Sequence, residues 1–409
     1  MSARRGSPDP HFDPWDPAYV ANPYPVYDRL RRERPVHDSP LGFWMITRYD
    51  DVMSLLRDER GSRELWRHNE AYLRSHAAAG PEWDRFICNQ VQFLDPPAHT
   101  RQRTLVSKAF TPRAIEGRRG VVQATVEQLL ADVAPSGRMD VVADLARPLP
   151  YRVICDLLGL PAADPRIESG WITAIVRGLS TIVTDDDMRA ASQALQRVTQ
   201  FVIEVIDEHR SVPEEDLLTA LIAAEEQGDR LRDEELVSLV INLFVGGSET
   251  TMNLIGSGVY SLLCHPAQMA TLQADPAGMR NAVEELLRFE PPAQFQSRTT
   301  LTDIEVRDVT VPAGRTLFLC LAAANRDPQR WDRPNELDVG RQDLQHLAFG
   351  YGIHHCLGAS LARLETQVAV GAALGLPELA LATDEPAWGG AAAISQRGLQ
   401  SLPVTFGAH

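Results

Sequence analysis

The sequence predicts a mainly α-helical protein with a minor β part. Apolar residues recur at helical spacing through most of residues 114–210, and one long helix candidate covers residues 234–264. The alternation that is typical of strands is confined to residues 43–47 and 304–321. No segment rich in Gly and Ser divides the 409 residues, so we expect one large core, although the length allows two or three average domains.

The first half of the chain contains one segment that departs from the helical trend. Residues 1–21 are expected to form an N-terminal tail, and residues 22–34 predict a short amphipathic helix. Residues 60–95 lack clean periodicity but are rich in aromatic side chains, which favours an irregular functional loop. Interruptions of the later helices are expected at residues 135–137, at residues 159–161 and at an acidic turn over residues 185–187.

The second half of the chain predicts two further helices around a β region. Residues 276–289 predict a helix that must end before Pro291 and Pro292. After the strand pattern, residues 325–345 form an irregular stretch rich in Pro, Arg and Asp. A glycine cluster then leads to Cys356, and a helix follows through about residue 374.

Composition excludes several classes of protein. The net charge of −15 argues against a general nucleic-acid binder, because such proteins are basic. The five cysteines contain no C-x-x-C pair, which fits a reducing compartment and disfavours a disulfide framework. The uncharged run from Leu236 to Ser248 is closed by Glu249, short of the roughly 20 residues that span a membrane. With no secretory signal, the sequence predicts a cytoplasmic protein without a membrane anchor.

The most informative window is residues 349–358, Phe-Gly-Tyr-Gly-Ile-His-His-Cys-Leu-Gly, directly before a helix. A thiol at a helix N-terminus is stabilised as thiolate by unpaired amides and by the helix dipole. An isolated thiolate suits an axial iron ligand better than a tetrahedral zinc site. A buried structural cysteine behind a Gly-rich turn is the alternative that the residues alone leave open.

A second pattern lies in the middle of the long helix, where Gly246 and Gly247 precede Glu249 and Thr250. Each glycine costs roughly 1 kcal/mol relative to alanine inside a helix, so something requires them. They leave room either for a ligand or for a closely packed neighbouring helix. Asn242 lies on the face of Gly246 and Thr250, where it lines a pocket or is a satisfied buried amide.

Charged pairs give two weaker signals. Glu285 and Arg288 are three residues apart on one helix face, but Glu284 could pair with Arg288 equally well, and either pair could lie on the surface. His99 and Arg103 are four apart, a spacing that suits either a bound carboxylate or an exposed polar face.

These motifs together resemble the cytochrome P-450 family, in its soluble bacterial class. The window Phe349-Gly350-x-Gly352-x-His354-x-Cys356-Leu357-Gly358 is similar to the heme-binding signature of that family. The E-x-x-R pair, the glycine-acid-threonine stretch and the pattern D-P-P-x-H-T-x-x-R occur in the order of the family. The resemblance implies a single P-450 fold over residues 22–409 that encloses heme b (iron protoporphyrin IX).

The resemblance also implies roles for individual residues. Cys356 is expected to ligate the heme iron, Thr250 to orient protons and water at O2, and Glu249 to connect that site to solvent. Glu285, Arg288 and Arg341 are expected to form a structural triad. The residues expected to bind the heme are His99, Arg103, Arg298, His354, Gly246, Phe349, Gly350, Leu357 and Gly358.

The implied activity is that of a monooxygenase, which inserts one oxygen atom from O2 into a largely apolar or aromatic small molecule of secondary metabolism. Electrons would come from NAD(P)H through a reductase and a ferredoxin, which would dock on a monomer at a basic face. Oxidative coupling of an aromatic substrate is the alternative, and a non-catalytic heme sensor comes last. Loop position and family analogy assign the pocket to Trp66, Trp83, Phe86, Asn242, Val245, Ala293, Phe295 and Ile394, and the basic face to Arg101, Lys108 and Arg113.

Overall fold

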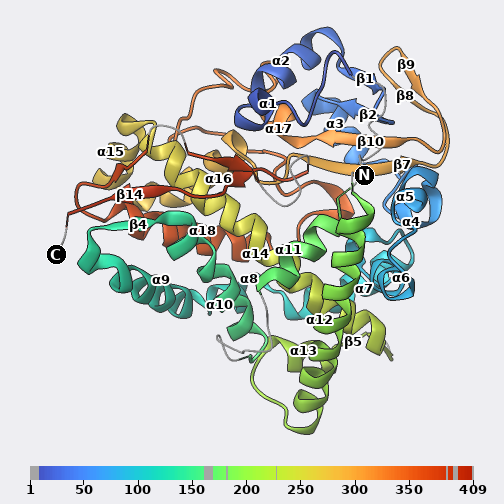
Figure 1. The fold of residues 1–409 in the computed structure, drawn as a ribbon, viewed down its shortest axis with the longest axis horizontal. Coiled ribbons are helices and arrows are strands. Elements are labelled where there is room, and N and C mark those ends of the chain that lie inside the picture. Colours follow the sequence, from blue (N-terminus) through green and yellow to red (C-terminus); the bar gives the residue numbers. More distant parts are fainter. Residues whose placement is uncertain are drawn as a thin grey trace.

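Helix α14 (Asp233–Leu263) lies at the centre of the computed structural model (Figure 1). The structure describes residues 9–160, 169–180, 183–226, 228–383, 386–389 and 395–407. Helices α10 (Pro148–Leu157), α12 (Asp185–Ser211), α16 (Met279–Phe289) and α18 (Ala359–Leu374) pack around α14. Most α14 side chains are buried around its whole circumference, as in a helix that crosses a protein core.

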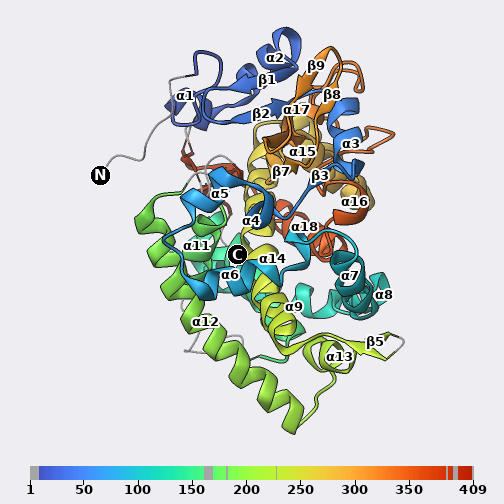
Figure 2. The same ribbon diagram turned by 90° about the vertical axis from the view of Figure 1, so that its right-hand side faces the viewer.

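A five-stranded sheet occupies the opposite end of the molecule from α12 and α13 (Leu217–Ala223) (Figures 1 and 2). Its strand order is β1-β2-β10-β7-β3. Strand β10 runs parallel to β2 and antiparallel to β7, with Thr316 opposite Phe43 and Thr299. The bounds of these strands are β1 (Val36–Ser39), β2 (Phe43–Ile46), β3 (Gly61–Ser62), β7 (Phe295–Thr300) and β10 (Thr316–Cys320).

The remaining elements complete the helical body and the edges. The helices are α1 (Pro17–Ala21), α2 (Tyr24–Glu33), α3 (Tyr49–Arg57), α7 (Ala98–Ala109), α8 (Pro112–Glu116), α9 (Arg119–Val133), α11 (Ser169–Gly178), α15 (Pro266–Ala274) and α17 (Leu321–Ala324). A π-helix covers Val141–Ala146, and 3₁₀ turns cover Val91–Phe93, Ala134–Ser136, Pro276–Gly278 and Gly352–His354. The short strands are β4 (Arg138–Asp140), β5 (Glu225–Glu226), β6 (Asp229–Arg230), β8 (Ile304–Val306), β9 (Val309–Val311), β11 (Ala380–Leu381), β12 (Trp388–Gly389), β13 (Gly398–Leu399) and β14 (Pro403–Thr405). No helix of the described residues is long and apolar enough to cross a membrane.

The mainly α prediction is confirmed, and so are the long helices and the strands after residue 304. The prediction of an irregular loop at residues 60–95 is wrong. That segment contains α4 (Leu65–His68), α5 (Glu70–Ser75) and α6 (Pro81–Cys88). These helices are set by local capping, since Asn69 accepts from the Tyr72 amide and Pro81 begins α6. Each is too short to show a helical period.

The acidic residues 185–187 do not form a turn that interrupts the helices. They form the first turn of α12, where Thr184 and Asp187 cap each other's backbone in a capping box. Carboxylates are favourable at this end of a helix because of its dipole. The three aspartates therefore start the helix that they were expected to break.

The described part of the predicted N-terminal tail packs onto the sheet. The Asp9 carboxylate accepts hydrogen bonds from His37 at 2.8 Å and Ser39 at 2.7 Å. Phe12 and Tyr19 are buried in an N-terminal aromatic cluster made of Phe12, Tyr19, Tyr27, Phe43, Phe295 and Phe318. Residues 9–21 thus contribute to the core near β2 and β10.

Candidate heme-thiolate site

Cys356 lies between the 3₁₀ turn Gly352–His354 and the first residue of α18. Its amide donates to the Phe349 carbonyl at 2.9 Å, which closes the loop. Gly358, the N-cap of α18, donates its amide to the cysteine sulfur. Cys356 is exposed. Burial by surrounding atoms nevertheless raises the pKa of the thiol, while the Gly358 amide and the guanidinium groups of Arg103 and Arg363 lower it.

The glycines before Cys356 are required by the backbone. Gly350 has a φ of +70°, and a Cβ there would lie 2.5 Å from the Gln296 amide nitrogen. Gly352 has a φ of +74°, and a Cβ there would lie 3.3 Å from the Leu56 carbonyl oxygen. Left-handed conformation and close contact together explain why glycine occupies both positions.

Buried nitrogen atoms of histidine and arginine side chains gather near this loop. The rings of His99 and His354 lie 4.3 Å apart between centroids, and Nδ1 of each ring is buried without a hydrogen-bond partner. Nη2 of the buried Arg298 also has no partner. Burial together with nearby guanidinium groups lowers the pKa of His99 to about 4 and lowers those of His354 and Arg298 strongly.

Buried donors without acceptors are costly, so this cluster fits a ligand that brings negatively charged oxygens. The propionate groups of heme have that chemistry, and the thiol of Cys356 supplies an iron ligand in the same region of the chain. The residues present therefore fit a heme. His99, Arg298 and His354 would hold its propionates.

Arg63 belongs to the same electrostatic neighbourhood and was missed by the sequence analysis. Its charge lowers the pKa values of His354 and Arg298. Its guanidinium donates to the Ser297 carbonyl at 2.8 Å and to the Gln92 carbonyl at 3.0 Å. No motif identifies Arg63, because it acts from a segment expected to be an irregular loop.

Arg103 contacts the cysteine loop directly. Its Nη2 donates to the His355 carbonyl at 2.8 Å, which ties α7 to the cysteine loop. Its charge also acts on Cys356 and His354. Phe349 packs in that loop beneath the Arg363 guanidinium, which lies 4.4 Å from its ring, and half-buried Leu357 packs against the larger core.

The two glycines of α14 have different surroundings. A Cβ at Gly246 would meet only the Asn242 side-chain oxygen, at 3.9 Å, whereas one at Gly247 would lie 3.0 Å from Ile154 of α10. Gly246 therefore leaves open space, and Gly247 is a packing notch. The Thr250 hydroxyl donates to the Gly246 carbonyl at 2.8 Å, on the face that Asn242 shares.

Two neighbouring residues of α14 have other surroundings. Glu249 is 9% exposed, so its carboxylate is largely enclosed by protein. Val245 faces α11 and α12, where it lies in an apolar pocket together with Trp171 and Phe201. The expected pocket residues on α14 thus divide between two faces of the helix.

The expected triad is present as a buried network. Arg288 donates to both Glu285 oxygens at 2.7 and 2.8 Å, and Arg341 donates to the same carboxylate at 3.1 and 3.2 Å. Arg288 also donates to the Asn325 carbonyl at 2.9 Å, and the Asn325 side chain accepts from the Leu347 amide at 2.7 Å. This chain of bonds connects the triad to the loop that carries the cysteine.

The alternative partner Glu284 does not bind Arg288. It accepts from Arg363 at 2.6 and 2.9 Å and lies 3.1 Å from His346. Although burial raises the pKa of Glu284, these partners lower it to about 2. Glu284 therefore links α16 to α18 beside the cysteine, a role that spacing in the sequence did not indicate.

Several expected pocket residues are not brought together. Trp83 and Phe86 are buried in the larger core, and Trp83 lies against the backbone of Gly178. Phe295 packs on Tyr27 in the N-terminal aromatic cluster. Trp66 donates to the Phe93 carbonyl at 3.3 Å, Ala293 forms a bridge with Gln396, and Ile394 lies outside the described residues.

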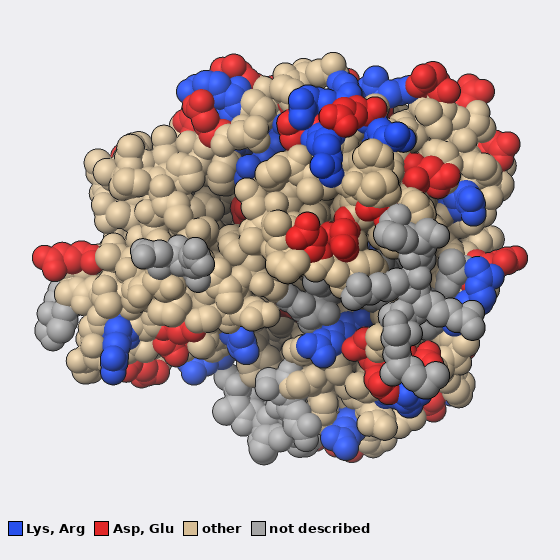
Figure 3. Space-filling view, turned by 45° about the horizontal axis from the view of Figure 1, so that its top comes forward, with Lys and Arg blue, Asp and Glu red and all other residues tan. Residues whose placement is uncertain are grey.

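The predicted basic face is smaller than expected. Arg101 donates to both oxygens of the buried Glu235, at 2.5 and 2.6 Å, and also pairs with Asp229, so it is largely neutralised. Lys108 and Arg113 are exposed. On the face seen in Figure 3, basic and acidic side chains are interspersed.

Comparisons with known proteins agree with this geometry. The model of the family described as Cytochrome P450 matches residues 172–276 and 278–383. The polyketide biosynthesis cytochrome P450 PksS of Bacillus subtilis is 36% identical over 97% of this chain and 98% of its own. The cytochrome P450 monooxygenase PikC of Streptomyces venezuelae is 40% identical over 95% and 92%.

Solved structures give the same result. The crystal structure of CalO2 has a TM-score of 0.90 and 35% identity over 97% of this chain and 99% of its own. Epothilone D-bound cytochrome P450epoK has a TM-score of 0.90 and 34% identity over 97% and 98%. The fold and the site define a heme-thiolate oxidoreductase. The chain belongs to the cytochrome P450 family of monooxygenases, whose cofactor is heme iron.

Proposed function

We propose that this monooxygenase inserts one oxygen atom of O2 into a largely apolar small molecule of secondary metabolism. The observation that carries the proposal is the open face of α14 at Gly246, with the Thr250 hydroxyl beside it. This face offers space for a substrate next to a group that exchanges protons. When bound, the heme iron supplies the activation of O2.

The side chains of this protein would hold charge and protons around that chemistry. The Gly358 amide, Arg103 and Arg363 stabilise negative charge on the Cys356 sulfur. The Thr250 hydroxyl hydrogen is directed at the Gly246 carbonyl, so its oxygen can accept a hydrogen bond from water. Glu249, the preceding residue, would connect this position to solvent.

The substrate class rests on analogy with named relatives. PksS is described as a polyketide biosynthesis enzyme, and 39%-identical relatives include the vitamin D(3) 25-hydroxylase of Pseudonocardia autotrophica. P450epoK binds epothilone D. The named molecules, vitamin D(3) and epothilone D, support an organic small-molecule substrate here. The oxidative-coupling alternative rested on four aromatic residues, Trp66, Tyr72, Trp83 and Phe86. Trp83 and Phe86 are buried, so they give this alternative less support.

The electron supply remains part of the proposal: NAD(P)H, a reductase and a ferredoxin that docks near Lys108 and Arg113. Arg101 is left out of this face because Glu235 and Asp229 already bind it. A related solved structure is a P450BioI complex with a ligated acyl carrier protein, and it supports testing a carrier-bound substrate as well as a free one. We also retain a monomer working in the cytoplasm as expectations from the sequence.

Turnover under ¹⁸O₂ tests the proposed reaction. Purified enzyme, heme-loaded and supplied with NAD(P)H, reductase and ferredoxin, would be incubated with compounds chosen by their displacement of the iron-bound water in a spin-state titration. A product that carries one ¹⁸O atom supports oxygen insertion. A product that has lost two hydrogens and carries no label overturns the proposal in favour of oxidative coupling. Absence of NAD(P)H consumption with every compound tested overturns it in favour of a heme sensor.

A further inference from the structure

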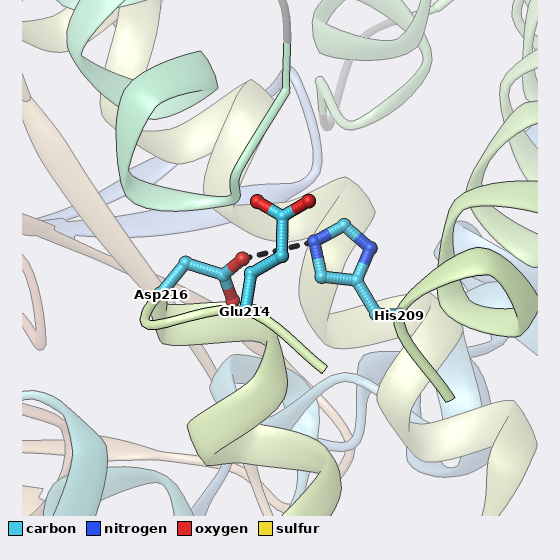
Figure 4. A group of neighbouring side chains, drawn as sticks. All are labelled: His209, Glu214 and Asp216. Carbon is cyan, nitrogen blue, oxygen red and sulfur yellow. Dashed lines mark hydrogen bonds and ion pairs between the residues drawn. The ribbon is translucent and has the colours of Figure 1, made fainter. Parts of the chain in front are cut away.

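Three side chains gather where α12 leads into α13, on the helical side of the molecule. His209 extends from the last turn of α12, and Glu214 and Asp216 come from the connection to α13 (Figure 4). Their ligand atoms all lie within 4.8 Å of one another, the one such group found among the described residues. The His209 and Asp216 side chains are only 6% and 5% exposed, whereas Glu214 is exposed.

The hydrogen bonds of His209 leave one ring nitrogen in an unusual position. Nδ1 lies 2.8 Å from the Val205 carbonyl, which can only accept, so Nδ1 carries a hydrogen. Nε2 lies 3.0 Å from Oδ2 of Asp216. In a neutral ring the Nε2 lone pair would face a carboxylate oxygen, which is repulsive. A proton or a metal cation must therefore lie next to both atoms.

A backbone amide positions the Asp216 carboxylate. Oδ1 of Asp216 accepts from the Thr219 amide at 2.7 Å and so caps α13. The Thr219 hydroxyl in turn accepts from the Glu214 amide at 3.1 Å. Oδ2 of Asp216 is left for His209, and the exposed Glu214 side chain can rotate toward the pair.

Gly159, in the segment that follows α10, borders the His209–Asp216 pair. It has a φ of +67°, and a Cβ there would lie 2.3 Å from Oδ2 of Asp216 and 2.8 Å from Nε2 of His209. The Gly159 backbone therefore packs closely against the two ligand atoms, and a side chain at this position would press on both of them.

We propose that His209 Nε2, Asp216 Oδ2 and a Glu214 oxygen bind a zinc ion, with water as the fourth ligand. One imidazole and two carboxylates suit tetrahedral zinc, whereas magnesium and calcium prefer sites built from oxygen alone. The ion would join the end of α12 to the start of α13 and would lie against the segment that follows α10. The site is separate from the residues that fit the heme, so we expect the ion to have a structural role.

Zinc titration of the full-length, heme-loaded protein tests this site. Calorimetry with zinc chloride in chelator-free buffer should give about one equivalent bound, and zinc should raise the unfolding temperature. Glu214→Gln should weaken binding by about tenfold or more, because it removes a ligand from the surface without disturbing a buried contact. Glu215→Gln is the matched control, since it makes the same charge change at the neighbouring position. It should bind zinc as the parent does.

The heme absorption spectrum should stay unchanged on adding zinc, which separates this site from the cysteine loop. His209→Gln should abolish binding, with heme content and circular dichroism reporting whether that buried variant still folds. Absence of zinc binding by the parent protein would overturn the proposal in favour of a proton shared by His209 and Asp216. Equal binding by the parent and Glu214→Gln would overturn it too, by placing the metal elsewhere.

Discussion

At the scale of single residues, the environment of Cys356 balances opposing effects. Burial favours the neutral thiol, while the Gly358 amide and two guanidinium groups favour the thiolate that a heme iron requires. Arg103 stabilises negative charge on the cysteine sulfur. It also stabilises the loop through its hydrogen bond to the His355 carbonyl. The site therefore depends on a few identifiable contacts.

Cys356→Ala should remove the red-shifted carbon monoxide band of the reduced protein, because alanine offers no thiolate to the iron. The measurement is a difference spectrum of the ferrous protein with carbon monoxide. Cys264→Ala, at an exposed cysteine that ends α14, should keep the band and serves as control. Retention of the band in Cys356→Ala would sink the assignment of the ligand.

Thr250→Ala should retain heme but uncouple turnover, with peroxide released in place of product. Alanine removes the hydroxyl that lies over the Gly246 carbonyl, and a positioned proton donor contributes about 100-fold or more to such steps. Peroxide formed per NAD(P)H consumed measures the effect. Thr250→Ser keeps a hydroxyl and should stay near parental coupling. Unchanged coupling in the alanine variant would show that substrate or water supplies the protons.

Glu365 gives a prediction about pH. It is buried in α18, its Oε2 has no hydrogen-bond partner, and burial raises its pKa well above the ordinary value. The folded protein keeps this proton at a pH where the unfolded chain loses it. Stability therefore falls with rising pH, by up to about 1.4 kcal/mol per unit above the unfolded pKa of about 4.3.

Glu365→Gln has no proton to lose, so its stability relative to the parent should rise between about pH 5 and pH 8. Denaturant unfolding at several pH values measures the difference. Glu127→Gln, at an exposed position of α9, should run parallel to the parent. Parallel profiles for Glu365→Gln would mean that the carboxyl is ionised in the folded protein.

At the scale of elements, α14 combines a packing face with an open face one residue apart. Gly246→Ala should add up to about 1 kcal/mol of stability, because its Cβ meets open space and alanine favours the helix. Gly247→Ala should leave the free energy of unfolding unchanged or lower it, since its Cβ would press on Ile154. Urea unfolding compares the two.

The double variant Gly247→Ala with Ile154→Val removes the methyl group that would clash, so it should recover part of the lost stability. The change in heme spin state on adding substrate should differ from that of the parent in Gly246→Ala. In Gly247→Ala it should equal that of the parent. Identical unfolding of the two single variants would contradict the assignment of the two faces.

Element prediction succeeded where a pattern was long or local chemistry was decisive. The α14 and α18 patterns run over many turns, so their periods are clear. Strand β7 was not predicted because every residue of its sequence, FQSRTT, except the phenylalanine is polar, yet it lies between β10 and β3 in the sheet. The helices of residues 60–95 were not predicted because each has only one or two turns.

At the scale of the whole molecule, the candidate site was predictable wherever a motif lies within one short segment. Cys356 and the Glu285 and Arg288 pair were found in this way. Arg63 and the Arg101–Glu235 pair were not, because their partners are far away in the chain; Arg101 and Glu235 are 134 residues apart. Spacing in a sequence does not encode contacts that only the assembled fold creates.

Removal of the first residues tests the packing of the N-terminal segment. Deletion of residues 1–8 keeps every contact between described residues and serves as the reference for a longer deletion. Deletion of residues 1–21 removes buried Phe12 and Tyr19, each worth roughly 3 kcal/mol or more, and the Asp9 contacts with His37. Denaturant midpoints that coincide would show that this segment adds nothing to the core.

Glu284 and Glu285 have a consequence for how the chain finds its fold. Successive residues of a helix are turned by about 100°, so these neighbours face Arg363 and Arg341 on different sides of α16. A slip of α16 by one residue would leave guanidinium groups buried without a counter-charge, which is strongly unfavourable. The two adjacent acids thus act as a register mark, which only the correct alignment of α16, α18 and the cysteine loop satisfies.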